Sequence, residues 1–411
     1  MKIAMVSEHA SPLAARAAGS AVRGLGTADA GGQNVFVADL ASRLGALGHH
    51  VTVYTRRDDP RLPTRVRLAP GVTVEHVPAG PAEPIPKDEL LPLMPDFGRH
   101  LERRWAGDPP DVAHAHFWMS GLATAQAAGN LGRRRVPMVQ TYHALGSVKR
   151  RHQRDKDTSP PGRVQLERAL GRTADAVIAT CADETEELVR LGVPRDRITV
   201  VPCGVDLTVF RPDGPRASRG ARPRLVTLSR LVERKGVDTA IRSLARVPGA
   251  ELVVAGGPRR AELDGDPEAR RLRAVAEDCG VADRVRFLGR VGRAQASRLL
   301  RSADLVVTLP WYEPFGMVPL EAMACGVPVV ATAVGGHLDT VIDGVTGVHV
   351  APRTPEQTAR VIRALLADPT RRAAMGFAAG DRARSRYSWE RIAHETLTVY
   401  RRAMARSEVP A

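Results

Sequence analysis

The sequence predicts an α/β protein made of two doubly wound domains. Its 411 residues are more than one domain usually holds. Short apolar runs of strand length alternate with longer segments of helical periodicity, an order typical of parallel sheets with helices on both faces. The alternation stops once, at a Pro-, Gly- and Arg-rich stretch near residue 211, and then begins again.

In the first half, apolar runs of four to six residues predict the strands, and the helices lie between them. The longest helical pattern is QNVFVADLASRLGALG at 33–48, whose apolar residues fall close to a helical spacing. The predicted strands are 2–7, 50–55, 112–117, 136–142, 175–180 and 198–202.

In the second half the same alternation returns and ends in a long amphipathic helix, 388–406. The predicted strands are 224–231, 250–257, 285–289, 304–310 and 327–332, and the predicted helices are 236–247, 267–280 and 293–303. The predicted organisation is a first domain at 1–210, a linker at 211–222, a second domain at 223–386 and a C-terminal helix at 387–411.

The formal net charge of +15 raises the possibility of nucleic-acid binding. However, only five of the 60 basic residues are lysines, a bias typical of a GC-rich genome, and aromatic residues make up 4% and do not interleave with the basic ones. Because base-stacking platforms need such aromatics, we expect no nucleic-acid partner.

No apolar run approaches the ~18 residues of a membrane span. The start, MKIAMVSEHA, lacks the features of a signal peptide and matches a first strand. We therefore expect a cytoplasmic protein with no integral membrane segment. The four cysteines, which form no CxxC pair, are expected to be reduced thiols: Cys181, Cys203, Cys279 and Cys325.

Two glycine pairs stand where ligands approach the backbone in α/β sheets. Gly31 and Gly32 precede a helix, whose N-terminus favours an anion. Gly335 and Gly336 follow a predicted strand, so their N–H groups are candidates for a phosphate or a carboxylate. The stretch GLGTAD at 24–29, just before the first pair, is not the dinucleotide fingerprint, because it lacks the third glycine and does not directly follow a strand.

The second domain carries two cations and two carboxylates after its strands. Arg230 and Lys235 follow the first strand, and a guanidinium beside an ammonium suits a diphosphate, although two solvated cations are the alternative. Glu313 and Glu321 lie eight residues apart, at the start of a helix and inside it. One carboxylate can bind a ribose diol, as in dinucleotide sites, and the other the transferred sugar.

His114 and His116 end a strand and lie on one face of it. No third metal ligand stands at a useful spacing, so we expect His114 to be packed and hydrogen-bonded. His116, nearer the end of the strand, is the better candidate for a site.

These residues together resemble the retaining glycosyltransferases of family four, which have the GT-B fold of two Rossmann-like domains facing across a cleft. The matching features are Gly31-Gly32-Gln33, His116, Arg230, Lys235 and the stretch EPFGMVPLE at 313–321. The segments GGQNVFV, HAHFWMSG and HALGSVK are most similar to the branch that contains sucrose-phosphate synthases and the mycothiol-pathway enzyme that glycosylates inositol phosphate.

The resemblance implies a hexosyl transfer from a nucleoside-diphosphate sugar, with UDP-glucose or UDP-N-acetylglucosamine expected as donor, to a hydroxyl of a small polar acceptor. It implies that Arg230 and Lys235 hold the diphosphate, Glu321 the ribose and Glu313 the sugar. His116 would lie beside the anomeric centre. The remaining donor contacts implied are Gly32, Phe315, Gly316 and the backbone of Arg290 toward the nucleobase.

The resemblance also implies an acceptor site in the first domain, with a sugar or cyclitol phosphate as one expected acceptor. Its members would be Gln33, Lys87, Thr141, Lys149 and Arg163. Phe117 stands where the branch has a tyrosine, so one hydroxyl contact to a phosphate is missing. The segment 8–30 is also expected to line this site.

Other functions remain open at this level: a nucleotide-sugar epimerase, or a non-catalytic sugar-nucleotide binding module. An epimerase needs an extra base, for which no acid is evident, and a module without activity is expected to have lost a site residue. Two DxD patterns, at 155–157 and 264–266, lie in polar loops without a preceding apolar strand. We therefore expect no metal and no cofactor beyond the donor.

Overall fold

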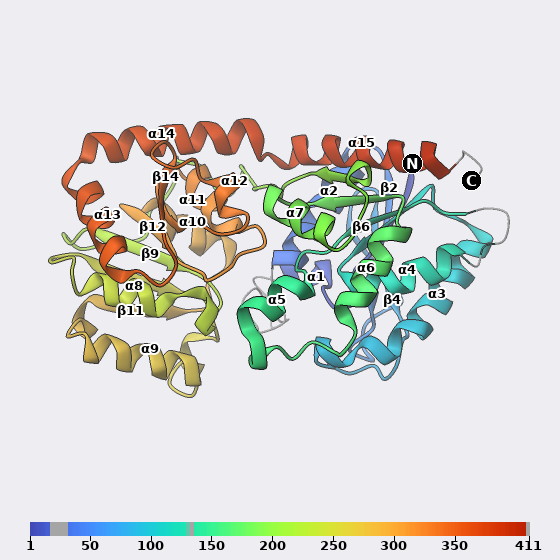
Figure 1. Ribbon diagram of the computed structural model, residues 1–411, viewed down its shortest axis with the longest axis horizontal. Coiled ribbons are helices and arrows are strands. Elements are labelled where there is room, and N and C mark those ends of the chain that lie inside the picture. The colour runs from blue at the N-terminus through green and yellow to red at the C-terminus, as the bar shows by residue number, and fades with distance from the viewer. Residues whose placement is uncertain (17–31, 130, 132–134, 408–411) are drawn as a thin grey trace. The chain divides into compact units, whose positions relative to one another are not determined.

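The computed structural model describes residues 1–16, 32–129, 131 and 135–407. These residues form two compact units. One comprises the described residues within Met1–Ala17, Asp29–Pro202 and Trp389–Ala411, and the other comprises Cys203–Ser388. In each unit helices cover both faces of one sheet (Figure 1). The prediction of two doubly wound α/β domains is confirmed.

The first unit contains an eight-stranded sheet in the order β3-β4-β2-β1-β5-β6-β7-β8, parallel except for the β3–β4 pair. Helices α2 and α15 pack together on one face of this sheet, and α3, α4 and α6 cover the other. The strands are β1 (Lys2–Val6), β2 (His50–Arg56), β3 (Arg65–Ala69), β4 (Val72–Val77), β5 (Val112–His116), β6 (Met138–Thr141), β7 (Ala176–Ala179) and β8 (Ile198–Val200). The α-helices are α1 (Pro12–Arg16), α2 (Gly32–Ala46), α3 (Met94–Gly107), α4 (Trp118–Gly129), α5 (Gly146–Gln153), α6 (Arg163–Thr173), α7 (Ala182–Arg190) and α15 (Trp389–Ser407).

The second unit contains a six-stranded, fully parallel sheet in the order β11-β10-β9-β12-β13-β14. Helices α8, α9 and α13 cover one face, and α10 and α11 the other. The strands are β9 (Arg224–Leu228), β10 (Glu251–Ala255), β11 (Val285–Gly289), β12 (Leu305–Thr308), β13 (Val329–Thr332) and β14 (Gly347–Val350). The α-helices are α8 (Val237–Leu244), α9 (Pro267–Asp278), α10 (Arg293–Arg301), α11 (Met317–Ala324), α12 (His337–Thr340), α13 (Pro355–Ala367) and α14 (Pro369–Arg386).

Short 3₁₀ turns complete the framework, and two of them carry predicted site residues, Lys87 and Lys235. The turns are η1 (Lys87–Glu89), η2 (Leu91–Leu93), η3 (Arg154–Lys156), η4 (Arg195–Arg197), η5 (Glu233–Lys235), η6 (Arg260–Glu262) and η7 (Ala282–Arg284).

The sequence patterns did not predict β3, β4, β14 or the division of residues 355–386 into two helices. The β3–β4 hairpin is the antiparallel exception to an otherwise parallel sheet, and it turns at Pro70-Gly71, where Gly71 has a φ of 71°. Only one of the five residues of its edge strand β3 is buried, so this strand lacks the continuous apolar run of a buried strand.

The C-terminal helix α15 belongs to the first unit. The Tyr400 hydroxyl lies 2.7 Å from His114 Nδ1, and the Trp389 indole packs edge-on against the Phe36 ring at 5.4 Å. The unit thus combines the two ends of the chain, with β1 at one and α15 at the other.

Both sheets reverse their strand order once, in the first unit between β1 and β5 and in the second between β9 and β12. Ligands of open α/β sheets bind outside the carboxyl ends of the strands at such points. The predicted site residues should therefore gather after these four strands.

Candidate functional site

In the first unit, Gln33 joins the carboxyl ends of β1 and β5. Its amide nitrogen donates to the Ser7 hydroxyl at 3.1 Å and to the His116 carbonyl at 3.2 Å. Gln33 lies in the first turn of α2, directly after Gly32, which is exposed. Gly31 and residues 17–30 of the predicted acceptor segment lie outside the described residues.

Three histidine rings lie close together next to the Gln33 contact at the end of β5. His116 Nδ1 and His143 Nε2 share a hydrogen bond of 3.0 Å, and the rings of His116 and His114 lie 4.0 Å apart. Burial, together with repulsion from its two neighbours, lowers the pKa of His116 well below its ordinary value. The His116 ring is therefore neutral, and its Nε2 is buried without a hydrogen-bond partner.

His114 is packed and fully hydrogen-bonded, as predicted. Its ring lies between the Tyr400 hydroxyl, at 2.7 Å, and the Thr141 hydroxyl, at 2.8 Å. Thr141, predicted to contact the acceptor, is fully buried with its hydroxyl on His114. Its contribution to acceptor binding stays a prediction.

A buried acid that the sequence reasoning missed follows β1. Glu8 is 1% exposed, and its carboxylate accepts a hydrogen bond from the Ser120 hydroxyl. His9 Nδ1 lies 2.7 Å from the same carboxylate, and the His9 ring packs edge-on against Phe117. An acid within an apolar first-strand pattern was the available signal.

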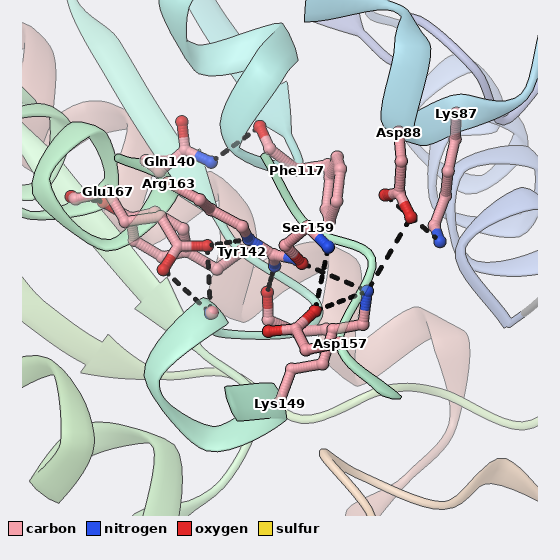
Figure 2. Close-up of polar contacts among 12 residues, drawn as sticks. Lys87, Asp88, Phe117, Gln140, Tyr142, Lys149, Asp157, Ser159, Arg163 and Glu167 are labelled. Atoms are coloured by element: carbon pink, nitrogen blue, oxygen red, sulfur yellow. Dashed lines mark hydrogen bonds and ion pairs between the residues drawn. The ribbon is translucent and has the colours of Figure 1, made fainter. Parts of the chain in front are cut away.

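The three basic residues predicted to bind the acceptor all lie in this unit, on three different elements. Lys87 stands on η1, Lys149 on α5, and Arg163 at the start of α6 (Figure 2). Lys149 and Arg163 are joined through Ser159, whose hydroxyl lies 3.1 Å from each side chain. The structure therefore brings these sequence-distant cations into one connected group.

In the second unit, Lys235 and Glu313 form a buried ion pair, with side chains 16% and 13% exposed. Lys235 stands on η5 after β9, and Glu313 in the loop between β12 and α11. Gly236, next to Lys235, has a φ of 65°, and a Cβ there would lie 2.0 Å from the Leu309 carbonyl oxygen. This close approach of the two loops requires glycine.

The electrostatics of the pair reflect an excess of positive charge. Burial raises the pKa of Glu313, but the charges of Lys235 and Arg234 outweigh burial and lower it to about 2. Burial, with repulsion from Arg234 and Arg230, lowers the pKa of Lys235 to about 8 despite its carboxylate partner. One carboxylate among three cations leaves a positive potential that suits a diphosphate.

Arg234 is a candidate that the sequence reasoning missed. Its guanidinium lies over the Tyr312 ring at 5.1 Å, and its Nη1 is buried without a hydrogen-bond partner. Its carbonyl accepts from the Trp311 N–H at 2.9 Å, which holds the two loops together. The stretch LSRLVERKG contains three candidate cations, and the sequence does not show which of them face the site.

The sequence predicts that the N–H groups of Gly335 and Gly336 face a ligand. The structure differs, because one of the two N–H groups is already bonded to the protein. The Gly336 N–H donates to the Glu313 carbonyl at 3.1 Å. A Cβ on Gly335 would lie 2.1 Å from that same oxygen, and one on Gly336 would lie 2.4 Å from the Phe315 Cα. The glycine pair therefore allows this turn to pack against the loop that carries Glu313.

His337, also missed, packs against the same loop. Its Nδ1 bonds to the Thr332 carbonyl at 3.1 Å, and its buried Nε2 has no hydrogen-bond partner. Burial lowers the pKa of His337 to about 4, so the ring is neutral. Gly316, the N-terminal cap of α11, has a φ of 88°, and a Cβ there would meet the His337 ring at 2.7 Å.

The other predicted donor contacts occupy loops and helix starts of the second unit. Phe315 is buried with its ring 6.4 Å from that of Tyr387, and Glu321 is half-buried on α11. The Arg290 N–H donates to the Pro258 carbonyl at 2.8 Å. The backbone group that Arg290 retains for a nucleobase is therefore its carbonyl.

Three aspartates of the two DxD patterns contact other groups of the protein. Asp157 pairs with Lys149 at 3.0 Å, Asp264 bonds to Arg273, and Asp266 caps the N-terminus of α9. Among the described residues, no three His, Cys, Asp or Glu side chains gather closely enough to hold a metal ion. Over the same residues, none of the helices combines the length and apolarity needed to cross a bilayer.

Comparisons with known proteins show the family of the chain. Residues 30–209 match the family model "Glycosyltransferase Family 4", and residues 214–382 match "Glycosyl transferases group 1". A D-inositol 3-phosphate glycosyltransferase from Xylanimonas cellulosilytica is 40% identical over 98% of this chain and 97% of its own. One from Kribbella flavida is 38% identical over 98% and 96%.

Solved structures extend the likeness to three dimensions. Sucrose-phosphate synthase from Thermosynechococcus elongatus superimposes with a TM-score of 0.87 and 31% identity, over 98% of this chain and 99% of the other. HepE from Anabaena, solved with UDP and glucose, has a TM-score of 0.73 and 22% identity over 97% and 98%, and shows the fold alone. The chain therefore belongs to the family-four glycosyltransferases of the GT-B fold, and it is a glycosyltransferase.

Proposed function

We propose that this glycosyltransferase moves a hexosyl group from a UDP-sugar to a hydroxyl of a small sugar or cyclitol, with retention of anomeric configuration and without a metal ion. The observation that carries the proposal is the Lys235–Glu313 ion pair, embedded in excess positive charge after β9 and β12. This edge of the sheet is where the fold binds nucleotides.

Lys235 of this pair and the two neighbouring cations, Arg230 and Arg234, support a role in holding the donor and its leaving group. In the transfer, the bond between the anomeric carbon and the diphosphate oxygen breaks, and the bond to the acceptor oxygen forms. Lys235 and Arg230, beside Arg234, would stabilise the negative charge that develops on the departing diphosphate. The acceptor hydroxyl would pass its proton to that diphosphate as the new bond forms.

Glu313 is suited to hold sugar hydroxyls rather than to protonate them. Its pKa of about 2 keeps it an anion near neutral pH, and Lys235 bonds to one of its oxygens. We assign Glu321 to the ribose. Neutral His116, with Nε2 left unbonded, would donate or accept a hydrogen bond beside the anomeric centre.

The acceptor class is supported by the two relatives described above, both of which carry the name D-inositol 3-phosphate glycosyltransferase, and by the sucrose-phosphate synthase likeness. The first unit supplies the corresponding loops, with Gln33 and the connected group of Lys87, Lys149 and Arg163.

One assay tests the proposal. UDP-glucose and UDP-N-acetylglucosamine, with GDP-mannose as a comparison, are incubated with and without sugar and cyclitol acceptors, and products are read by mass. Proton NMR of the first-formed product then reports its configuration. An epimerised donor in the absence of acceptor, or a β-linked product from an α-linked donor, would contradict the proposal.

The same assay tests the absence of a metal. With excess chelator we expect more than about half of the activity to remain, because the cations of the donor site are side chains. A magnesium-dependent kinase in the same buffer is the control for effective chelation. Complete loss that only magnesium or manganese restores would revive a metal role for one of the DxD stretches.

A further inference from the structure

The loop after β1 holds a buried carboxylate, and both of its oxygens contact the protein. The Glu8 side chain is 0% exposed, and its carboxylate accepts a hydrogen bond from the Ser120 hydroxyl and lies 2.7 Å from His9 Nδ1. The Glu8 N–H donates to the Ser120 hydroxyl at 3.0 Å, and the Glu8 carbonyl accepts from the Arg56 N–H at 3.0 Å. The backbone and the carboxylate of Glu8 are therefore both fixed, and the carboxylate is enclosed.

The contacts of the Glu8 carboxylate connect it to His9. Removing a carboxylate from water is costly unless the group is paired and hydrogen-bonded. Among the described residues, His9 is the one basic side chain that pairs with Glu8. An apolar side chain of similar volume could fill this place in the core at little cost, since such replacements of buried charged groups are often neutral. The carboxylate therefore matters most for what it does to the His9 ring.

His9 presents one ring nitrogen to Glu8 and leaves the other for a ligand. Because a carboxylate only accepts hydrogen bonds, Nδ1 carries the hydrogen of their contact, and in the neutral ring Nε2 keeps its lone pair. The side chain is 11% exposed, and its Nε2 has no hydrogen-bond partner among the described residues. The Phe117 ring packs edge-on against the imidazole, with 5.0 Å between the centroids, and limits its rotation. Nε2 is therefore a hydrogen-bond acceptor with a fixed direction.

His9 lies at the point where the first sheet reverses its strand order. It follows the carboxyl end of β1, and Phe117 follows the carboxyl end of the neighbouring strand β5. Gln33 joins the same two strand ends through its bonds to Ser7 and His116. Ligands of open α/β sheets bind outside such a point. A polyol offers hydroxyl hydrogens there, and a hydroxyl hydrogen is the partner that the Nε2 lone pair lacks.

We infer that Glu8 is a positioning residue of the transferase, which fixes the orientation and the tautomer of His9 so that Nε2 accepts a hydrogen bond from a hydroxyl of the acceptor. The inference rests on the proposed glycosyl transfer and adds to it a residue that orients the acceptor. Glu8 acts only through His9. Its removal should therefore change the state of the imidazole ring, and not merely the stability of the loop.

The first test is the tautomer of His9 in the full-length protein, with its histidines labelled with nitrogen-15. Correlation spectra of the ring nitrogens distinguish a hydrogen on Nδ1, on Nε2 or on both, and the signals missing from His9→Ala identify His9. At slightly alkaline pH we expect the hydrogen on Nδ1 in the unchanged protein. In Glu8→Met we expect it on Nε2, the form that free histidine prefers in water. A hydrogen on Nε2 or on both nitrogens in the unchanged protein, or the same tautomer in both proteins, would overturn the inference.

The second test compares the kinetics of Glu8→Met with those of the matched control Glu186→Met. Glu186 also pairs with a basic residue in the first unit, but it is 60% exposed on α7. UDP-glucose and UDP-N-acetylglucosamine serve as donors, and inositol, fructose and their phosphates as acceptors. Glu8→Met should lower kcat/KM for the acceptor by about 10- to 100-fold and leave UDP affinity within about threefold, whereas Glu186→Met should match the unchanged protein. Circular dichroism melts verify folding, and equal kcat/KM in all three folded proteins would overturn the inference.

A double-mutant cycle tests whether Glu8 acts through His9. In His9→Ala no ring remains to be fixed, so the further change Glu8→Met should alter kcat/KM by less than about threefold. Losses that simply add would show that Glu8 acts elsewhere and would overturn the inference. If no acceptor is glycosylated with any donor, the proposed function fails, and the acceptor contact of His9 fails with it. The tautomer measurement needs no substrate, so it still decides whether Glu8 fixes the ring.

Discussion

Lys235 and Glu313 are 78 residues apart in the sequence and form one buried ion pair at the carboxyl ends of β9 and β12. Each was predicted as a donor-site residue from its own motif, and neither motif indicated that the two side chains touch. The pair means that a mutation of either residue changes the charge state and the position of the other.

Replacement of Lys235 by Ala should weaken binding of UDP by about 10- to 100-fold. The lost charge-assisted contact contributes about 1.5–3 kcal/mol, and each 1.4 kcal/mol is tenfold in affinity. Calorimetric titration with UDP measures the change. The exposed Lys156 supplies the control, Lys156→Ala, which should bind UDP normally; unchanged affinity in Lys235→Ala would remove Lys235 from the donor site.

The affinity for UDP should fall as pH rises through about 8. Burial and neighbouring cations lower the pKa of Lys235 from 10.5 to about 8, so the ammonium that attracts the diphosphate is lost above that pH. Well above it the loss approaches about tenfold per pH unit. In Lys235→Arg this alkaline loss should disappear, because the guanidinium stays charged; a Kd that is independent of pH in the unchanged protein would contradict the assignment.

Gly335→Ala should lower transferase activity by about 100-fold. The new Cβ would lie 2.1 Å from the Glu313 carbonyl oxygen, so the loop that carries Glu313 must move, and displacements near 1 Å cost about that much in rate. Gly344→Ala is the matched control, because Gly344 also has a positive φ, 75°, but no atom lies within 4 Å of its Cβ position. Both variants should lose some stability from backbone strain. Equal activity in the two would show that the close contact is unimportant.

His116→Ala should lower the rate of transfer by about 100-fold or more and leave UDP affinity within about threefold. The neutral imidazole is proposed to act beside the anomeric centre rather than on the diphosphate, so its loss should affect kcat more than nucleotide binding. Steady-state kinetics and UDP titration separate the two effects. His394→Ala, an exposed histidine of α15, serves as the control, and a loss of UDP affinity equal to the loss of rate would contradict this assignment.

Much of the fold follows from local patterns in the sequence. Strands of a parallel sheet are buried on both faces, so β1, β5, β9 and β12 appear as short apolar runs between amphipathic helices. The Pro-, Gly- and Arg-rich stretch near residue 211 separated the strands and helices of the first domain from those of the second. The β3–β4 hairpin was not predicted because only one residue of its edge strand is buried, so the strand has no such run.

The sequence by itself determined two doubly wound α/β domains and the motifs that follow their strands, because strand burial and turn chemistry are written into neighbouring residues. Only the tertiary structure decided the partners: Glu313 for Lys235, His143 for His116, and Asp88 between Lys87 and Lys149. It also assigned Gly335 to close packing rather than to a ligand. These contacts depend on which strand ends and loops become neighbours in the folded sheet. The order of the strands in the sheet follows from the packing of the whole domain rather than from local sequence.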